Sequence, residues 1–253
     1  MSNLLYRLYE SQLERGLAPS ELPHHVAVML DGNRRWAKTR GTQNPKAGHE
    51  AGALKIFEFL TWCDEIGIPM VTLYLLSTDN LKNRKPDELQ DLLGIITDVA
   101  DEMAYQQNWR LHVMGDRDLL PANIAEKLDA AVAKTANLDK PHVNLAVGYG
   151  GRKEIADAMR SILKDHAKQG TTIEELAELL DPELISEHLY TSGQPDPDLI
   201  IRTSGEQRMS GFLLWQSASS ELYFEEALWP DFRKVDFLRA LRAFEKRHRR
   251  YGA

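Results

Sequence analysis

The most informative segment of the chain is residues 24–38, HHVAVMLDGNRRWAK, in which an apolar run is followed by a carboxylate, a glycine and two arginines. Asp31 can hold a divalent cation through its carboxylate oxygens. Gly32 allows backbone N–H groups to approach an anion closely, and the forked donors of Arg34 and Arg35 match phosphate oxygens. These residue types in this order predict a site for a diphosphate and a metal ion.

Other polar clusters follow apolar runs farther along the chain. They are Ser77-Thr78-Asp79-Asn80 with Arg84, Gly150-Gly151-Arg152, and the residues from Thr203 to Ser210. Because the carboxyl ends of parallel strands meet at one edge of a sheet, we expect these clusters to converge with Asp31 there. Unpaired cations repel one another unless a polyanion lies among them, so arginines gathered at this edge favour an anion site. Its expected members are Arg35, Arg202, Arg208 and Ser210.

The elements that must position these residues are short apolar runs that alternate with longer segments of helical periodicity. The expected strands are 26–30, 70–76, 110–114, 142–147, 198–202 and 211–215. The expected helices are 46–66, 86–104, 121–135, 152–168 and 233–247. This alternation predicts an α/β fold with a central, mostly parallel six-stranded sheet flanked by helices.

The chain is expected to form one α/β domain over residues 24–253, preceded by a helical segment over residues 1–23. Its 253 residues, 43% hydrophobic and 27% charged, suffice for one large core and do not require two. Leu4, Leu5, Leu8 and Leu13 fall near one side of a helix at 3–15. That face could lie on a membrane surface or on the chain's own domain, and docking on the domain is the favoured interpretation.

Composition excludes several classes of protein. A net charge of −7 and a pI near 5.7 argue against a nucleic-acid binder, which needs a basic face. The single cysteine, Cys63, excludes an internal disulfide and a cysteine-based metal cluster. No run approaches the ~18 apolar residues of a membrane span, and the N-terminus lacks the pattern of a signal peptide. We therefore expect a cytoplasmic protein.

Three common phosphate-binding motifs are absent from the sequence. There is no G-x-x-x-x-G-K-[ST] loop of a P-loop NTPase and no G-x-G-x-x-G after the first expected strand. The residue two positions after Asp31 is Asn33, which disfavours an aspartyl-phosphate phosphatase.

The motifs together resemble the cis-prenyltransferases, the Z-isoprenyl diphosphate synthases. The resemblance extends from about residue 24 to the C-terminus and rests on Asp31 to Ala37, Gly48-His49, Tyr74 to Asn80, Tyr149 to Arg152 and Asp198 to Phe224. The D-D-x-x-D signature of trans-prenyltransferases is absent, since Asp196-Pro197-Asp198 does not match it. The resemblance implies a hydrophobic tunnel beside the sheet and Mg²⁺-dependent condensation of isopentenyl diphosphate with an allylic diphosphate.

The resemblance also implies roles for individual residues. Asp31 would bind Mg²⁺ and support departure of the allylic diphosphate, and Glu221 would serve Mg²⁺ across a dimer interface. The residues expected at the allylic diphosphate are Gly32, Asn33, Arg34, Arg35 and His49, and those at isopentenyl diphosphate are Arg202, Arg208 and Ser210. Further substrate contacts are expected at Trp36, Ser77, Thr78, Asp79, Leu81 and Arg84. Arg250 and Gly252, in the C-terminal R-x-G, would contact the partner subunit's substrate.

Asn80 is expected at the catalytic centre as a residue that orients the substrate. The family's usual proton acceptor is the asparagine at this position, yet a neutral amide is a very poor base. The released diphosphate, or Asp79 through a water molecule, is the expected proton sink. Asp79 could equally be a helix cap.

The chain departs from the family pattern at several positions. The loop Thr42–Lys46 is one residue longer than the common form and lacks the usual diphosphate-binding arginine, for which Asn44 or Lys46 is expected to substitute. Gln207 stands where many members have a metal-binding histidine, although an amide oxygen can also take Mg²⁺. Leu81 replaces a common tryptophan, and the longer segment after it leaves the register of Arg84 open by one residue.

Leu75 bears on the length of the product. In the family this position borders the tunnel for the growing tail, and makers of long chains usually have a small residue there. A leucine is expected to block the tunnel. An ordinary core leucine is the alternative, because strand register decides whether Leu75 or Leu76 faces the tunnel. With the Arg34-Arg35 pair and Gln207, Leu75 resembles the actinobacterial short-chain type, which makes Z,E-farnesyl diphosphate from geranyl diphosphate.

The leading hypothesis is therefore a homodimeric, Mg²⁺-dependent cis-prenyltransferase with a short, C15 product. One alternative is a longer-chain decaprenyl or undecaprenyl diphosphate synthase. Another is a non-catalytic partner subunit of a heteromeric enzyme, which is disfavoured because such partners lose the first-strand aspartate and its arginines. A plain phosphate-ester hydrolase is a more remote alternative. Peripheral membrane contact by residues 1–20 stays open.

Overall fold

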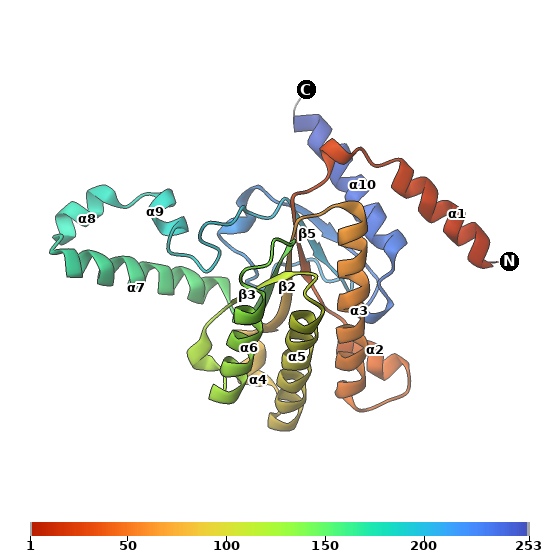
Figure 1. Ribbon diagram of the computed structural model, residues 1–253, viewed down its shortest axis with the longest axis horizontal. Coiled ribbons are helices and arrows are strands. Elements are labelled where there is room, and N and C mark those ends of the chain that lie inside the picture. The colour runs from red at the N-terminus through yellow and green to blue at the C-terminus, as the bar shows by residue number, and fades with distance from the viewer. Residues whose placement is uncertain (1, 252–253) are drawn as a thin grey trace.

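The computed structural model describes the backbone of residues 2–251 and the side chains of residues 8–247, and its centre is one sheet (Figure 1). The sheet has six strands in the order β3-β4-β2-β1-β5-β6, and all neighbours are parallel. The strands are β1 His25–Met29, β2 Met70–Ser77, β3 Arg110–Met114, β4 His142–Tyr149, β5 Leu199–Arg202 and β6 Glu221–Phe224. The predicted α/β fold with a six-stranded sheet is confirmed, and the sheet is wholly parallel.

Helices connect the strands and cover the sheet. They are α1 Ser2–Arg15, α2 Asn33–Thr39, α3 Pro45–Ile66, α4 Thr78–Asn83, α5 Pro86–Gln106, α6 Ala122–Thr135, α7 Gly151–Gln169, α8 Ile173–Leu179, α9 Pro182–Ser186 and α10 Lys234–Tyr251. The five expected helices are present with ends shifted by a few residues. Helices α3, α5 and α6 lie side by side, whereas α7 to α9 form an arm that extends away from the sheet (Figure 1).

The expected strand at 211–215 is wrong. Gly211 and Leu213 have left-handed backbone φ angles of 80° and 45°, which no extended strand adopts. Phe212 and Leu213 are fully buried against Met114 and Tyr149, so the apolar run is a buried turn rather than a strand. The sixth strand is β6, which pairs with β5 from Leu199↔Glu221 to Arg202↔Phe224.

The central strand β1 is buried on both faces, as its continuous apolar run indicates. Val26 and Val28 join the larger core cluster, which also contains apolar residues of α3, α5 and α10. Ala27 and Met29 face a smaller cluster on the other side of the sheet. Burial on both sides fixes the position of the residue that follows the strand, Asp31.

The N-terminal helix α1 packs along α10. Leu13 is buried, and Lys234 Nζ lies 3.4 Å from Glu14 Oε2. The end of this helix around Leu13 thus contacts the domain, whereas Leu8 is largely exposed. The side chains of Leu4 and Leu5 lie outside the described residues. Among the described helices, none is long and apolar enough to cross a membrane.

Candidate active site

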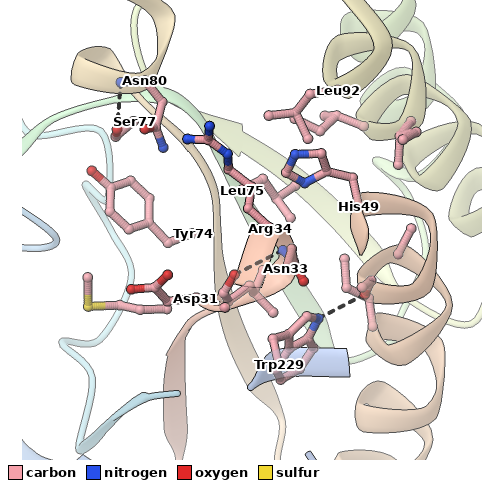
Figure 2. Close-up of a pocket in the computed structure, with 18 of the residues that line it drawn as sticks. Asp31, Asn33, Arg34, His49, Tyr74, Leu75, Ser77, Asn80, Leu92 and Trp229 are labelled. Atoms are coloured by element: carbon pink, nitrogen blue, oxygen red, sulfur yellow. Dashed lines mark hydrogen bonds between the residues drawn. The ribbon is translucent and has the colours of Figure 1, made fainter. Parts of the chain in front are cut away.

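A cavity of about 510 Å³ lies where β1 and β2 end, at the carboxyl edge of the sheet (Figure 2). Its mouth is polar and carries the positive side chains Arg34, Arg35, Lys38, Arg84 and Arg202. Asp31 is the one carboxylate among the described residues that line it. The inner part is lined by Ala53, Ile56, Leu75, Leu92, Ile95, Ile96 and Val99. Such a mouth fits a polyanion, and such an interior fits an apolar tail.

Asp31 is held at the mouth by its backbone as well as by its side chain. Its N–H donates to Thr203 Oγ1 at 3.0 Å, and its carbonyl accepts from the Thr203 hydroxyl at 2.7 Å and from the Trp229 N–H at 3.0 Å. Arg202 Nη2 donates to Asp31 Oδ2 at 2.8 Å, and Arg35 Nη2 lies 3.7 Å from Oδ1. The carboxylate is therefore oriented while it keeps partial access to solvent.

Helix α2 begins directly after this carboxylate. Gly32 has a φ of 111°, and a Cβ there would lie 2.9 Å from a Leu228 methyl carbon, so both the turn and the packing require glycine. Asn33 Nδ2 donates to Leu30 O at 3.2 Å, which holds the first turn of the helix against the strand end. Figure 2 shows Arg34 extending from this turn into the cavity, between the side of Ser77 and Asn80 and the side of His49.

A second cluster lies across the mouth, around Glu88 of α5. Its Oε1 accepts from Arg84 Nη1 and lies 3.3 Å from Arg34 Nε and 3.5 Å from His49 Nε2. His49 Nε2 is also 3.1 Å from Arg84 Nη1. Arg84, whose register the sequence left open by one residue, lines the cavity. Sequence reasoning missed Glu88: Arg84 lies in the extended link between α4 and α5, so no helical spacing indicated that the two side chains would meet.

This environment sets the charges of two titratable groups. Burial, followed by the charge of Arg84, lowers the pKa of His49, so its imidazole is neutral near pH 7. Burial acts to raise the pKa of Glu88, but Arg84, Arg34 and His49 outweigh it and hold that pKa below its usual value. Glu88 is therefore a stable counter-ion for the arginines beside it.

The segment after β5 forms the other side of the mouth. Arg202 is 4% exposed, and its Nη1 donates to Ser210 Oγ at 2.8 Å and to the carbonyl of Arg208. Ser204 and Ser210 have φ angles of 84° and 48°, which are strained for residues other than glycine. Residues with strained backbones tend to cluster at ligand-binding sites. Arg208 does not line the cavity, because its side chain points outward, is 65% exposed and pairs with Glu206.

The polar residues at the end of β2 and directly after it divide into two groups. Ser77 and Asn80 line the cavity, and the Ser77 hydroxyl caps α4 by accepting from the Asn80 N–H at 3.0 Å (Figure 2). Thr78, Asp79 and Leu81 do not line it, and Asp79 is exposed.

Several other expected site residues also lie away from the cavity. Trp36 turns outward, and its Nε1 donates to Asp231 Oδ1 at 2.8 Å. Glu221 begins β6, level with Leu199, so within one chain it lies at the opposite edge of the sheet from Asp31, and it pairs with Arg247 at 2.6 Å. Gly252 and the side chain of Arg250 lie outside the described residues.

The loop that was expected to replace an arginine borders an adjoining cavity of about 330 Å³. Asn44 Oδ1 accepts from the Lys46 N–H at 3.0 Å and so caps α3, while Lys46 Nζ lies 3.2 Å from Asp91 Oδ1. Both residues line the adjoining cavity rather than the main one. Gln207 is exposed and lines neither.

Leu75 lines the main cavity, and Leu76 is buried in the core at 1% exposure. The pairing of β2 with β4 shifts register between Tyr74 and Leu76, which lets the consecutive residues Tyr74 and Leu75 both face the cavity. Tyr74 also stacks on Phe212 with ring centroids 4.5 Å apart, and so connects the inner wall to the turn after β5. Sequence reasoning placed Leu92 and Ile96 on a helix face but did not assign that face to a cavity.

The donor set is compatible with Mg²⁺. The described residues contain no group of three histidine, cysteine, aspartate or glutamate side chains that could hold a metal ion alone. Magnesium, however, is commonly held by one or two carboxylates together with substrate phosphates and water. Asp31, on the rim of a strongly cationic mouth, provides one such carboxylate.

Comparisons with known proteins agree with this geometry. The family model described as putative undecaprenyl diphosphate synthase matches residues 29–252. A short-chain Z-isoprenyl diphosphate synthase of Mycobacterium bovis is 57% identical over 251 residues, covering 98% of this chain and 95% of that protein. A (2Z,6E)-farnesyl diphosphate synthase of Thermobifida fusca is 59% identical over 248 residues, covering 98% of this chain and 97% of that protein.

A solved structure also matches the fold. It is lavandulyl diphosphate synthase from Lavandula x intermedia in complex with dimethylallyl diphosphate, with a TM-score of 0.81 and 33% sequence identity over 89% of this chain and 96% of that one. Fold and site therefore define the class as a parallel α/β prenyltransferase. The chain belongs to the undecaprenyl diphosphate synthase family of prenyltransferases, and the predicted resemblance is confirmed.

Proposed function

We propose that this cis-prenyltransferase condenses isopentenyl diphosphate with geranyl diphosphate to form Z,E-farnesyl diphosphate, with Mg²⁺ as the metal ion. The observation that carries the proposal is one cavity whose cationic mouth leads to an apolar interior faced by Leu75. The names of the Thermobifida fusca and Mycobacterium bovis relatives support a short product. Cis-prenyl chain elongation follows from membership of the family.

The mouth is suited to departure of an allylic diphosphate. When the allylic C–O bond breaks, negative charge grows on the leaving diphosphate, and cations already aimed at it lower the barrier without reorganisation of water. On one side of the mouth, Glu88 holds Arg34 and Arg84 in place. On the other side of the mouth, Arg35 lies beside Asp31. Mg²⁺ held by Asp31 would supply further neutralisation of the diphosphate charge.

The second diphosphate, that of isopentenyl diphosphate, fits the side formed by Arg202 and Ser210. Its C=C bond would attack the allylic carbon, and a proton would then leave C2. Asn80 lines the cavity and would orient the substrate through its amide. Asp79 is exposed and outside the lining, which favours the released diphosphate as the proton acceptor.

A homodimer completes the proposal. Glu221 cannot join Asp31 within one chain, so its proposed service to Mg²⁺ requires a partner subunit, as does the proposed contact of Arg250 and Gly252 with the partner's substrate. Arg208, Trp36, Thr78 and Leu81 are proposed to approach substrate only in the assembled or substrate-bound state, since in this chain they do not line the cavity. A cytoplasmic location and peripheral contact with a membrane remain predictions.

The test is chain-length analysis with radiolabelled isopentenyl diphosphate and either a geranyl or a farnesyl primer. A single C15 product from geranyl diphosphate is expected, and activity should require added Mg²⁺. Extension well past C15 by the pure enzyme would instead support a longer-chain synthase. Inactivity of the chain expressed alone would support a non-catalytic partner subunit, against which Asp31, Arg35 and Arg202 at the mouth argue.

A further inference from the structure

Helix α2 presents two different faces to its surroundings. Asn33 and Ala37 face α3 so closely that a Cβ on Gly48 would lie 2.0 Å from Asn33 O and 3.2 Å from Ala37 Cβ. Arg34 and Lys38 are each one position farther along the helix and one turn apart, and both line the main cavity. The packing of α2 on α3 therefore directs Lys38, like Arg34, toward the mouth.

Lys38 differs from the other cations at the mouth because it is not neutralised. Each of the four arginines has a carboxylate within ion-pair distance: Arg34 and Arg84 have Glu88, Arg35 has Asp31 and Glu206, and Arg202 has Asp31. Lys38 has no ion pair with any of the residues whose side chains the structure describes. Its charge is therefore available to an anion that enters the cavity.

The two residues of the following loop that were expected to replace the missing arginine are already engaged. Asn44 uses its side-chain oxygen to cap α3, and Lys46 is paired with Asp91. They line only the adjoining cavity, whereas Lys38 lines both cavities and lies between them. Position and charge thus favour the helix residue over the loop residues.

We propose that Lys38 binds the outer phosphate of the allylic diphosphate. The inference deepens the proposed function and rests on it. Lys38 is four residues beyond Arg34, a rise of about 6 Å along α2, so its ammonium can reach past the phosphate held by Arg34. As a flexible point charge it needs no fixed geometry for this contact.

The test compares Lys38→Gln with Lys46→Gln as the matched control, because both remove one lysine charge within the same nine residues. In steady-state kinetics, Lys38→Gln should raise the KM for geranyl diphosphate ~10-fold and leave the KM for isopentenyl diphosphate within ~2-fold. Lys38→Arg should recover most of the loss. Lys46→Gln should leave both KM values unchanged. Geranyl monophosphate should inhibit the wild type and Lys38→Gln equally, since it lacks the outer phosphate.

Calorimetric binding of inorganic diphosphate separates this inference from the proposed function. If the wild type makes no condensation product but binds diphosphate more tightly than Lys38→Gln does, the proposed function fails and Lys38 stands only as a residue that binds diphosphate. If the wild type is active and Lys38→Gln keeps its KM for geranyl diphosphate, Lys38 is an ordinary solvated lysine and the inference is wrong. A loss that appears with Lys46→Gln instead would assign the contact to the loop.

Discussion

At the scale of single residues, the site depends on side chains whose partners fix both direction and charge. Asp31 is oriented by Arg202 and by the backbone contacts of Thr203, while the Glu88 carboxylate serves Arg34 and Arg84 together. Side chains that are already held in place stabilise the charge that develops in the transition state, because they need not reorganise during the reaction. Replacing one residue should therefore change one measurable property of the reaction, such as product length or kcat.

Leu75→Ala is expected to lengthen the product, because Leu75 faces the interior of the cavity and its removal makes room for further C5 units. Product length is measured by chromatography of the dephosphorylated, radiolabelled prenols. Leu76→Ala is the control: Leu76 is in the core, so the change should cost about 2 to 4 kcal/mol of unfolding free energy and leave product length alone. An unchanged product from Leu75→Ala would remove Leu75 as a determinant of length.

Asp31→Ala is expected to lower kcat by ~100-fold or more, since it removes the carboxylate proposed to hold Mg²⁺ and leaves Arg202 without its acidic partner. Thermal unfolding should show that the variant still folds, because the backbone contacts of residue 31 remain. Titration of activity with Mg²⁺ is the informative readout. Full activity in Asp31→Ala at ordinary Mg²⁺ concentrations would contradict the role proposed for this carboxylate.

At the scale of elements, the cavity is an arrangement of helices around the end of the sheet. Helices α2 and α3 form one wall and α5 the opposite one, and the turn after β5 closes the mouth. Glu88 joins the walls, because it lies on α5 and contacts Arg34 of α2 and His49 of α3. Together with the pair of Lys46 and Asp91 between α3 and α5, this carboxylate holds the walls of the mouth to one another.

Glu88→Ala is expected to lower the unfolding free energy by about 2 to 3 kcal/mol, because it leaves the largely buried Arg84 without its counter-ion. Urea unfolding measures the loss. Saturating inorganic diphosphate should restore part of it, since the ligand brings negative charge back to the same arginines. Glu102→Gln, on the exposed side of α5, is the control and should have no effect. A loss that diphosphate does not reduce would indicate a purely structural pair.

Periodicity predicted the long elements well, because helices such as α3 and α5 carry an apolar stripe over many residues. It failed for 211–215, where the apolar residues are buried in a turn with left-handed φ angles that no pattern of hydrophobicity reveals. Strand-end polar residues such as Asp31 and Ser77 could be predicted as site residues from topology alone. The orientation of Arg208 and Trp36, and the contacts of Glu88, depend on tertiary packing and could not.

At the scale of the whole molecule, a buried polar network connects strands on the side of the sheet away from α3. His25 Nδ1 lies 2.9 Å from Pro195 O, and its Nε2 lies 2.8 Å from the Thr72 hydroxyl. Asn144 Nδ2 donates to the same hydroxyl at 3.0 Å and to Gln194 Oε1 at 2.6 Å. The network therefore ties β1, β2 and β4 to the turn before β5.

Stability is expected to fall as the pH drops from about 6.5 toward 5. Burial, the largest influence, lowers the pKa of His25, so the unfolded chain binds a proton that the folded chain resists. The contribution of neutral His25 to the free energy of unfolding is fully present above the pKa that this histidine has in the unfolded chain. It is lost as the pH falls from there through the pKa that the histidine has in the folded chain, at up to about 1.4 kcal/mol per pH unit for each such group. Burial raises the pKa of Glu154 and so acts in the opposite direction.

The comparison that isolates His25 is urea unfolding of the wild type and of His25→Gln at pH 7.5 and 5.5. The variant should be less stable at pH 7.5 but should lose less stability on acidification. An equal loss in both proteins would assign the pH dependence to other groups, of which His49 and His112 also have pKa values lowered by burial.

The contact of α2 with α3 at Gly48 has a consequence for motion. Because Gly48 leaves no room for a Cβ against the Asn33 carbonyl, α2 and α3 are in close contact there, and we expect these two helices to move together. We therefore expect any opening of the cavity that admits a substrate or releases a product to come from α5 or from the turn after β5. Arg34 and Lys38, both proposed to bind diphosphate, are on α2, so we expect their positions relative to α3 to stay fixed while α5 moves.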